Sequence, residues 1–226
     1  MSVYKALLRI HRPIILWFAV IVLAVEAIGV VIITSATDLQ FSLWLAIAGS
    51  AVKYWTLVIG IMLVAMHLRQ FVANGVTRRE FVAGAALFML TVAGGFAVAV
   101  VLGHCLESAV AGAIGERAAG YPVLSAGGLL GELGRVLPQA IAWPLSGALI
   151  AVGFYRFRAW LGLIVMVAGA LPAAVAGGLV SLDEQGHVRD LLPYAPALLI
   201  WLVVTGLGAV ALHLLTRDVA IRPARG

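Results

Sequence analysis

Six long apolar segments constrain this 226-residue chain more than any other feature of its sequence. Each is about 18 to 23 residues long, and a helix of that length spans roughly 30 Å of hydrocarbon at about 1.5 Å per residue. The sequence therefore predicts an all-α polytopic membrane protein with six transmembrane helices. The predicted spans are residues 14–33, 43–65, 82–103, 136–153, 160–180 and 194–214.

Composition excludes a soluble enzyme domain. Hydrophobic residues make up 63% of the chain and charged residues only 11%, whereas soluble domains have about 45–50% and about 25%. The single cysteine, Cys105, excludes an intrachain disulfide framework and a cysteine-cluster metal site.

The distribution of basic residues predicts the topology. If the amino terminus is cytoplasmic, eleven basic residues fall on the cytoplasmic side and three on the other side, and the bias recurs in every loop. We therefore expect both termini on the cytoplasmic side of the membrane, and the net charge of +5 requires no nucleic-acid partner. The eleven residues are Lys5, Arg9, Arg12, Arg69, Arg78, Arg79, Arg156, Arg158, Arg217, Arg222 and Arg225.

The two ends of the chain flank the six-helix domain, residues 14–214. In residues 1–13, the basic residues follow helical spacing and Pro13 ends the segment. This pattern predicts a basic amphipathic helix on the inner leaflet, with Val3, Leu7, Leu8 and Ile10 facing lipid. A plain positively charged flank is the alternative. Residues 215–226 are predicted to form a basic cytoplasmic tail.

The segment between the second and third spans, residues 67–81, contains two helix-boundary motifs. Asn74 and Gly75 tolerate the left-handed conformation that ends a helix. Thr77 and Glu80 have the spacing of a capping box, and an apolar run follows them directly. The sequence thus predicts a helix that stops at Asn74–Gly75 and a new helix that starts near Thr77.

This predicted turn concentrates basic and aromatic side chains. It presents three arginines, Arg69, Arg78 and Arg79, with Phe71 and Phe81 nearby. A rigid charged turn of this kind is suited to docking on a cytoplasmic protein. An ordinary positive-inside hairpin with standard caps remains the alternative.

Two charged residues lie well inside the predicted spans. Glu26 and Lys53 each lie twelve residues from the predicted inner end of their span, about 18 Å above the inner boundary. An intramembrane charge is costly unless it is paired. We expect an interhelical Glu26–Lys53 ion pair that sets helix register, with a role in the substrate path as the alternative.

Catalytic and cofactor motifs are missing. The two lysines do not stand in a P-loop, no histidine pair has metal-ligand spacing, and paired intramembrane carboxylates are not expected. Ser146–Gly147 lacks the surroundings of a nucleophile elbow. We expect no catalytic residue, metal or cofactor on this chain.

The loop F-V-A-N-G-V-T-R-R-E-F-V-A-G, residues 71–84, resembles the turn between spans 2 and 3 in small membrane subunits of type 2, export-class bacterial ABC transporters. The matching positions are Gly75, Thr77, Arg78 and Phe81, and the basic amino-terminal segment and six spans match as well. The resemblance implies a translocation pathway whose 67–81 turn docks on a separate ATP-binding subunit. That subunit would bind ATP and magnesium, and a second permease copy or related chain would complete the assembly. One difference is that the longest external segment here lies between spans 3 and 4 instead of before the last span.

Two other functions remain open at this point. One is a stand-alone proton-coupled secondary transporter that uses Glu26 and Lys53. The other is a membrane scaffold or immunity protein that only binds a partner. The few polar side chains in the spans favour an amphipathic or lipid-like cargo and contact with membrane lipid.

Overall fold

The computed structural model describes residues 2–118, 120–124, 127–180 and 191–217, and in this part of the chain helices are joined by loops and turns, with no strand. Six of its helical stretches are long and apolar enough to cross a membrane, which confirms the predicted all-α, multi-pass architecture. The elements are α1 (Val3–Thr34), α2 (Leu43–Met62), the π-helix η1 (Leu63–Leu68), α3 (Arg69–Ala73), α4 (Arg78–Ile114), α5 (Leu129–Arg156), α6 (Ala159–Gly169), α7 (Leu171–Leu179) and α8 (Tyr194–Arg217).

Several helices extend well beyond the predicted spans. The predicted span 82–103 is the middle of α4, which has 37 residues and is thus about 55 Å long. Hydropathy locates the apolar part of a helix, but caps determine where it ends. Thr77 caps the start of α4, and Gly115, with φ of 80°, caps its end in the left-handed conformation.

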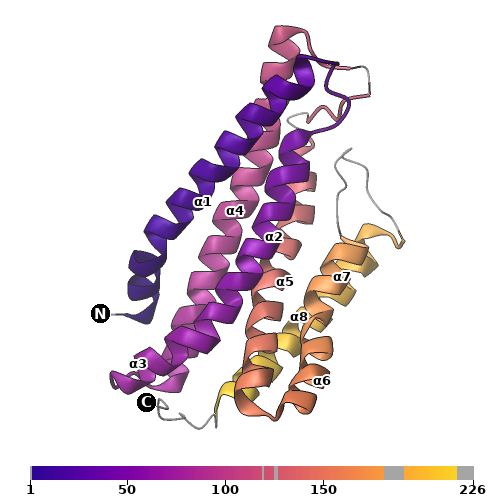
Figure 1. Ribbon diagram of the computed structural model, residues 1–226. Helices are drawn as coiled ribbons and strands as arrows, with labels where there is room; N and C mark the ends of the chain where they lie inside the picture. The colour runs from indigo at the N-terminus through magenta and orange to yellow at the C-terminus, as the bar shows by residue number, and fades with distance from the viewer. Residues whose placement is uncertain (1, 119, 125–126, 181–190, 218–226) are drawn as a thin grey trace.

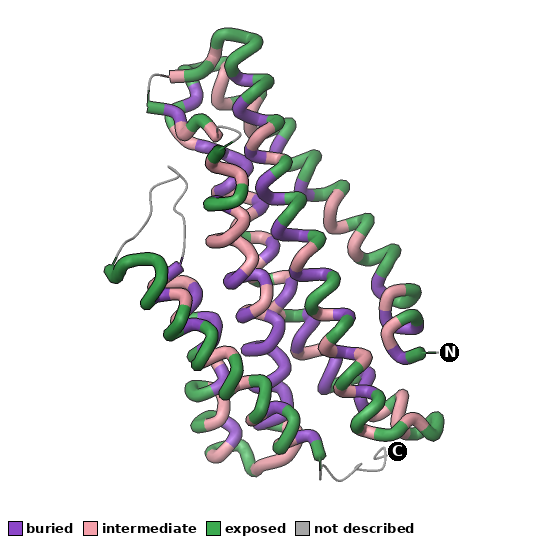
Figure 2. Tube along the Cα trace, turned by 180° about the vertical axis from the view of Figure 1, so that it is seen from behind, coloured by how far each residue is buried: buried purple, intermediate pink, exposed green. Residues whose placement is uncertain are grey.

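Helix α5 is the centre of the bundle. In the most apolar stretch of α5, 67% of the residues are buried. In the corresponding stretches of α1 and α8 only 11% are buried. It packs against α2, α4, α6, α7 and α8, and Figure 2 shows buried residues gathered along the middle of the bundle. The peripheral helices therefore turn most of their apolar side chains outward, as expected where lipid is the solvent.

A reciprocal pair of glycines lets the backbones of α2 and α5 approach each other closely. A Cβ added at Gly60 in α2 would lie 2.0 Å from the Pro144 carbonyl oxygen of α5. A Cβ at Gly147 in α5 would lie 2.1 Å from the Leu57 carbonyl oxygen of α2. Each backbone occupies the space that a side chain would need on the other helix, so this crossing requires glycine on both sides.

The fifth candidate span is interrupted at Ala170, between α6 and α7. Pro172 lies at the start of α7 and has no amide hydrogen to donate. The hydroxyl of Ser146 on α5 accepts a hydrogen bond from the Ala173 amide at 3.1 Å. Ser146 is fully buried, and this contact assigns it a structural role at the break.

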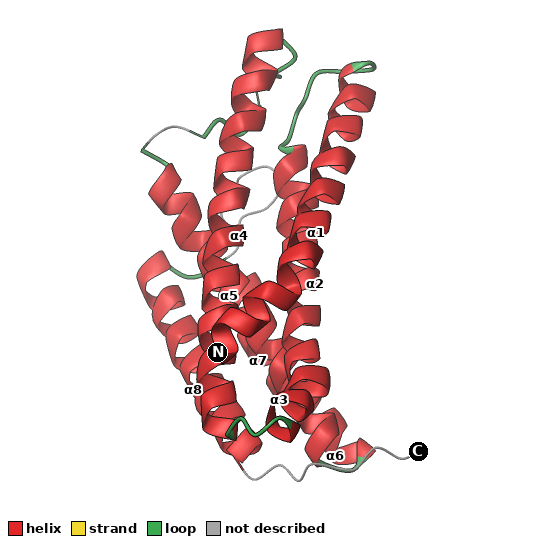
Figure 3. Cartoon of the chain, turned by 90° about the vertical axis from the view of Figure 1, so that its left-hand side faces the viewer, coloured by secondary structure: helices red, strands yellow, loops and turns green. Residues whose placement is uncertain are grey.

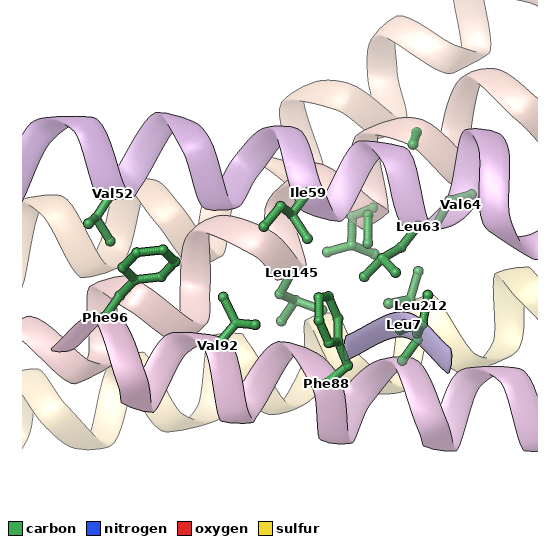
Figure 4. Packing of buried hydrophobic residues seen from close by; sticks show 14 of the residues in the cluster. Leu7, Val52, Ile59, Leu63, Val64, Phe88, Val92, Phe96, Leu145 and Leu212 are labelled. Carbon is green, nitrogen blue, oxygen red and sulfur yellow. The ribbon is translucent and has the colours of Figure 1, made fainter. Parts of the chain in front are cut away.

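The main hydrophobic core joins α1, α2, η1, α4, α5 and α8 (Figure 4). Phe88 and Leu7 are completely buried in it, and Leu63 is 1% exposed. Leu7 belongs to the segment for which we expected lipid contact. Val3 and Leu7 therefore face the protein core and Leu8 is half-buried, whereas Ile10 is exposed.

The amino-terminal segment differs from the expectation in two ways. Helix α1 continues through Pro13, although its first turns run across the bundle before the helix turns along it (Figure 3). Val3 is buried against Gly84 of α4, where a Cβ would lie 2.6 Å from the Val3 side chain. Lys5, Arg9 and Arg12 remain exposed, as predicted. A helix packed on protein through its apolar side replaces the predicted lipid-facing one.

We predict that Gly60→Ala and Gly147→Ala each lower the thermal stability of the detergent-solubilised protein. Each new methyl group would overlap a backbone carbonyl oxygen that cannot rotate away, so the loss should be at least the ~1–3 kcal/mol typical of overpacking. Tryptophan fluorescence during heating measures it.

Gly94→Ala and Gly95→Ala are the matched controls, because a Cβ at either position meets no atom within 4 Å. They should change the unfolding temperature little. Equal losses in all four variants would contradict the glycine-crossing assignment.

Candidate docking site at the basic end

The turn predicted at residues 67–81 forms as expected. Helix α3 ends at Ala73, and Gly75 adopts a left-handed φ of 84°. The backbone then enters α4 at Arg78, one residue after the N-cap Thr77. We name the end of the bundle that holds this turn the basic end, and α8 also ends there, at Arg217 (Figure 1).

A complete capping box fixes the start of α4. The Glu80 amide donates to the Thr77 hydroxyl at 3.2 Å. The Thr77 amide donates to the Glu80 carboxylate at 3.0 Å, and the Thr77 hydroxyl donates to it at 2.8 Å. These bonds satisfy amide groups that a helix start would leave unpaired. The turn is therefore held by its own hydrogen bonds and not only by packing.

Aromatic contact joins the two sides of the turn. The rings of Phe71 and Phe81 lie 5.6 Å apart between centroids. Phe81 is buried in the main core, and Phe71 packs on that core while staying partly exposed. The turn is thus anchored to the bundle and cannot swing as a free loop.

A groove of about 730 Å³ opens beside the turn. Both sides of it carry basic groups, Arg78 and Arg79 from α4 and His213 and Arg217 from α8. Arg79 and Arg217 are exposed and Arg78 is half-exposed. The floor is formed by Val72, Val76, Thr77, Val82 and Thr216. A groove with an apolar floor and a basic rim can accept an acidic, partly apolar protein segment.

The π-helix η1 connects the turn to the core. His67 lies in η1, and its Nδ1 is 3.1 Å from the Met62 carbonyl oxygen five residues earlier. Its ring lies 5.0 Å from the His11 ring of α1, and the His11 ring lies 4.9 Å from Phe88 of α4. Single-turn π segments are often found at functional sites, and this one holds three helices together just before the turn. Sequence analysis considered the histidines only as metal ligands and missed this contact.

The predicted Glu26–Lys53 ion pair is not seen among the described residues, where both Glu26 carboxyl oxygens are buried without a hydrogen-bond partner. Phe18 of α1 stacks on Trp55 of α2, and Gly29 approaches Leu43. In that register Lys53 is level with Val20, about six residues or roughly 9 Å below Glu26. The predicted ion pair assumed that Glu26 and Lys53 lie at equal distances from the inner ends of their predicted spans. Those ends were misplaced, because the helices extend beyond the apolar segments by unequal lengths.

Lys53 instead faces the space between α2, α4 and α5, where it lines a small cavity with Gln139 and Val100. Glu26 lies near the Glu107 carboxyl group of α4. Two buried carboxyl groups therefore meet at this end of the bundle. Sequence analysis assigned Glu107 to the external segment, so the pairing was missed.

Glu107 also closes the start of α2. One carboxylate oxygen accepts the Ser42 hydroxyl at 2.5 Å, and the other accepts the Leu43 amide at 2.8 Å. The Ser42 hydroxyl accepts the Leu45 amide at 3.1 Å. A carboxylate at a helix amino terminus is favoured by the helix dipole and by the free amides there. These residues define the acidic end of the bundle, opposite the basic end.

A buried ion pair completes the acidic end. His104 Nδ1 lies 2.9 Å from the Glu132 carboxylate, and His104 Nε2 lies 2.9 Å from the Pro122 carbonyl oxygen. The pair joins α4 to α5 and to the segment between them. No group of three metal-ligating side chains occurs in the described part of the chain.

Comparison with known proteins identifies no relative: no family model, no curated protein and no solved structure matches the chain.

We predict that Thr77→Ala weakens the start of α4 by about 0.5–2 kcal/mol, the usual cost of losing an N-cap side chain. Amides of residues 78–81 should exchange with deuterium faster, which peptide-resolved hydrogen–deuterium exchange measures. Thr91→Ala is the matched control. Thr91 is an exposed mid-helix threonine whose hydroxyl bonds the Leu87 carbonyl oxygen, and its loss should leave this peptide unchanged. Unchanged exchange at residues 78–81 in Thr77→Ala would argue against a stabilising capping box.

Proposed function

We propose that this chain is the membrane subunit of an ABC-type exporter, coupled through its 67–81 turn to a separate ATP-binding subunit. The observation that carries the proposal is the basic groove beside that turn, since a rigid cap and a ready-made binding surface occur together there. The resemblance of residues 71–84 to the corresponding turn of type 2 permeases supports the same assignment.

In this proposal the basic end faces the cytoplasm of a bacterial cell, with both termini inside. The positive-inside distribution of the basic residues supports that orientation. The amino-terminal turns of α1 would lie near the inner leaflet, with Lys5, Arg9 and Arg12 exposed toward lipid headgroups. A second copy or a related chain would complete the pathway.

The contacts of the turn support a mechanical role. A force on the turn would reach the core through η1 and through the His67–His11 contact. The α6–α7 break at Ala170 and the prolines inside α5 offer points where helices can bend. ATP-driven closure of the partner subunits would use these points to switch the pathway between inward and outward arrangements. An amphipathic or lipid-like molecule is the cargo class that the apolar spans suit.

The position of Lys53 counts against the main alternative. A proton-coupled carrier built on Glu26 and Lys53 needs these groups at matched depth, whereas Lys53 lies about six residues below Glu26 and lines a different cavity. A binding-only scaffold would share the basic groove, and only a functional assay separates it from a permease.

We predict that the double variant Arg78→Glu and Arg79→Glu loses the partner ATPase, because charge reversal would repel an acidic docking surface. The measurement is affinity purification from native membranes in mild detergent. A P-loop ATPase is identified in the eluate by mass spectrometry, and vanadate-sensitive ATP hydrolysis is assayed.

Arg158→Glu is the matched control. It reverses an exposed charge in the turn between α5 and α6, outside the groove. It should keep the ATPase and its activity. Full ATPase recovery with the double variant would refute docking at the groove, and transport that follows a proton gradient without ATP would favour a secondary carrier.

A further inference from the structure

The acidic end contains a pair of buried carboxyl groups that the proposed function does not use. Glu26 is 8% exposed and Glu107 is 9% exposed, and the two lie near each other between α1 and α4. Two negative charges placed together away from water repel strongly, so such pairs are usually stable only when one member holds a proton.

Hydrogen bonding distinguishes the two members. Both oxygens of Glu107 accept hydrogen bonds, from the Ser42 hydroxyl and the Leu43 amide at the start of α2. Such donors and the helix dipole stabilise a carboxylate anion. Neither oxygen of Glu26 has a partner in the described structure. An ionised Glu26 would therefore be a buried charge with no donor, whereas a protonated Glu26 has an O–H that can be given to Glu107.

The other polar groups at this place bring no positive charge to Glu26 among the described residues. Tyr121, in the segment after α4, has a buried hydroxyl. Burial and the nearby Glu107 carboxylate raise the pKa of its phenol, so it stays neutral at physiological pH. His104 is already paired with Glu132. From α2, only the Ser42 hydroxyl and the Leu43 amide face the pair, and the described residues bring no cation to Glu26.

We propose that Glu26 and Glu107 form a proton-binding site at the acidic end, with the proton carried by Glu26 and shared toward Glu107. The ligand is a proton and not a metal ion, because no third metal-ligating side chain joins the pair in the described structure. The shared hydrogen links Glu26 of α1 to Glu107 of α4, and Glu107 in turn caps the start of α2. It is independent of the docking groove, which lies at the opposite end of the bundle.

Between α1, α2 and α4, toward the basic end, lies a groove of about 270 Å³. Its lining includes Val22, Ala48 and Phe96 and is apolar apart from the indole N–H of Trp44, which donates to the Val100 carbonyl oxygen at 2.7 Å. No hydroxyl, amide or charged side chain lines it to relay a proton toward Lys53. This groove therefore offers no side-chain relay from the carboxyl pair toward Lys53.

Infrared spectroscopy of the purified full chain in lipid nanodiscs tests the proposal. A protonated carboxyl group gives a C=O stretch above the amide I region, and it shifts when hydrogen is exchanged for deuterium, unlike the lipid ester band. At neutral pH the wild-type protein should show this band, and Glu26→Gln should lose it. Glu80→Gln should keep it, because Glu80 is an exposed capping carboxylate at the other end.

A second variant of Glu26 and the addition of metal-ion salts complete the experiment. Glu26→Asp retains a carboxyl group and should show the band at a shifted position, which covers the case in which Glu26→Gln does not fold. Sodium, potassium, magnesium and calcium chlorides are added to wild type at constant pH, and the band should persist. A wild-type protein without a deuterium-sensitive carboxyl band, a band that survives in Glu26→Gln, or a band displaced by one of these cations would each overturn the proposal.

Discussion

The crossing of α2 over α5 is the contact on which the rest of the bundle depends. In lipid, apolar side chains gain little by leaving their solvent, so close backbone packing must hold helices together. Gly60 and Gly147 allow this by placing each backbone against a carbonyl oxygen of the other helix. Because α5 then contacts all the later helices and α4 as well, the position of most of the bundle follows from this crossing.

The second constraint is that helix ends need hydrogen-bond partners. Two different solutions occur at the two ends of the bundle. At the basic end, α4 is capped locally by Thr77 and Glu80, three residues apart. At the acidic end, α2 is capped by Ser42 together with Glu107, which is 64 residues away from Leu43. The local cap gives a turn that holds its own shape, and the distant cap ties the start of α2 to the last two turns of α4.

This difference explains what the sequence could predict. The capping box and the stop at Gly75 depend on neighbouring residues, so the turn at 67–81 was predicted almost residue by residue. The six apolar segments were recognised for the same reason. Contacts between helices were not predictable in this way. Matched distances from the span ends suggested a Glu26–Lys53 pair, but the actual register depends on Phe18 against Trp55 and Gly29 against Leu43. The adjacent glycines Gly94 and Gly95 face open space, whereas isolated Gly60 and Gly147 make the crossing.

Helix α4 joins the two polar ends, and its regularity determines where the molecule can move. It runs from Arg78 to Ile114 without proline or a change of helix type. A displacement of the basic turn along the axis of α4 would therefore carry Glu107 with it, and with Glu107 the cap of α2. Its neighbours are less regular: α2 passes into the π-helix η1, and the fifth span is broken at Ala170. Since a stiff helix lies beside interrupted ones, bending should concentrate at η1 and at the α6–α7 break, while α4 keeps the docking groove and the carboxyl pair at a fixed separation.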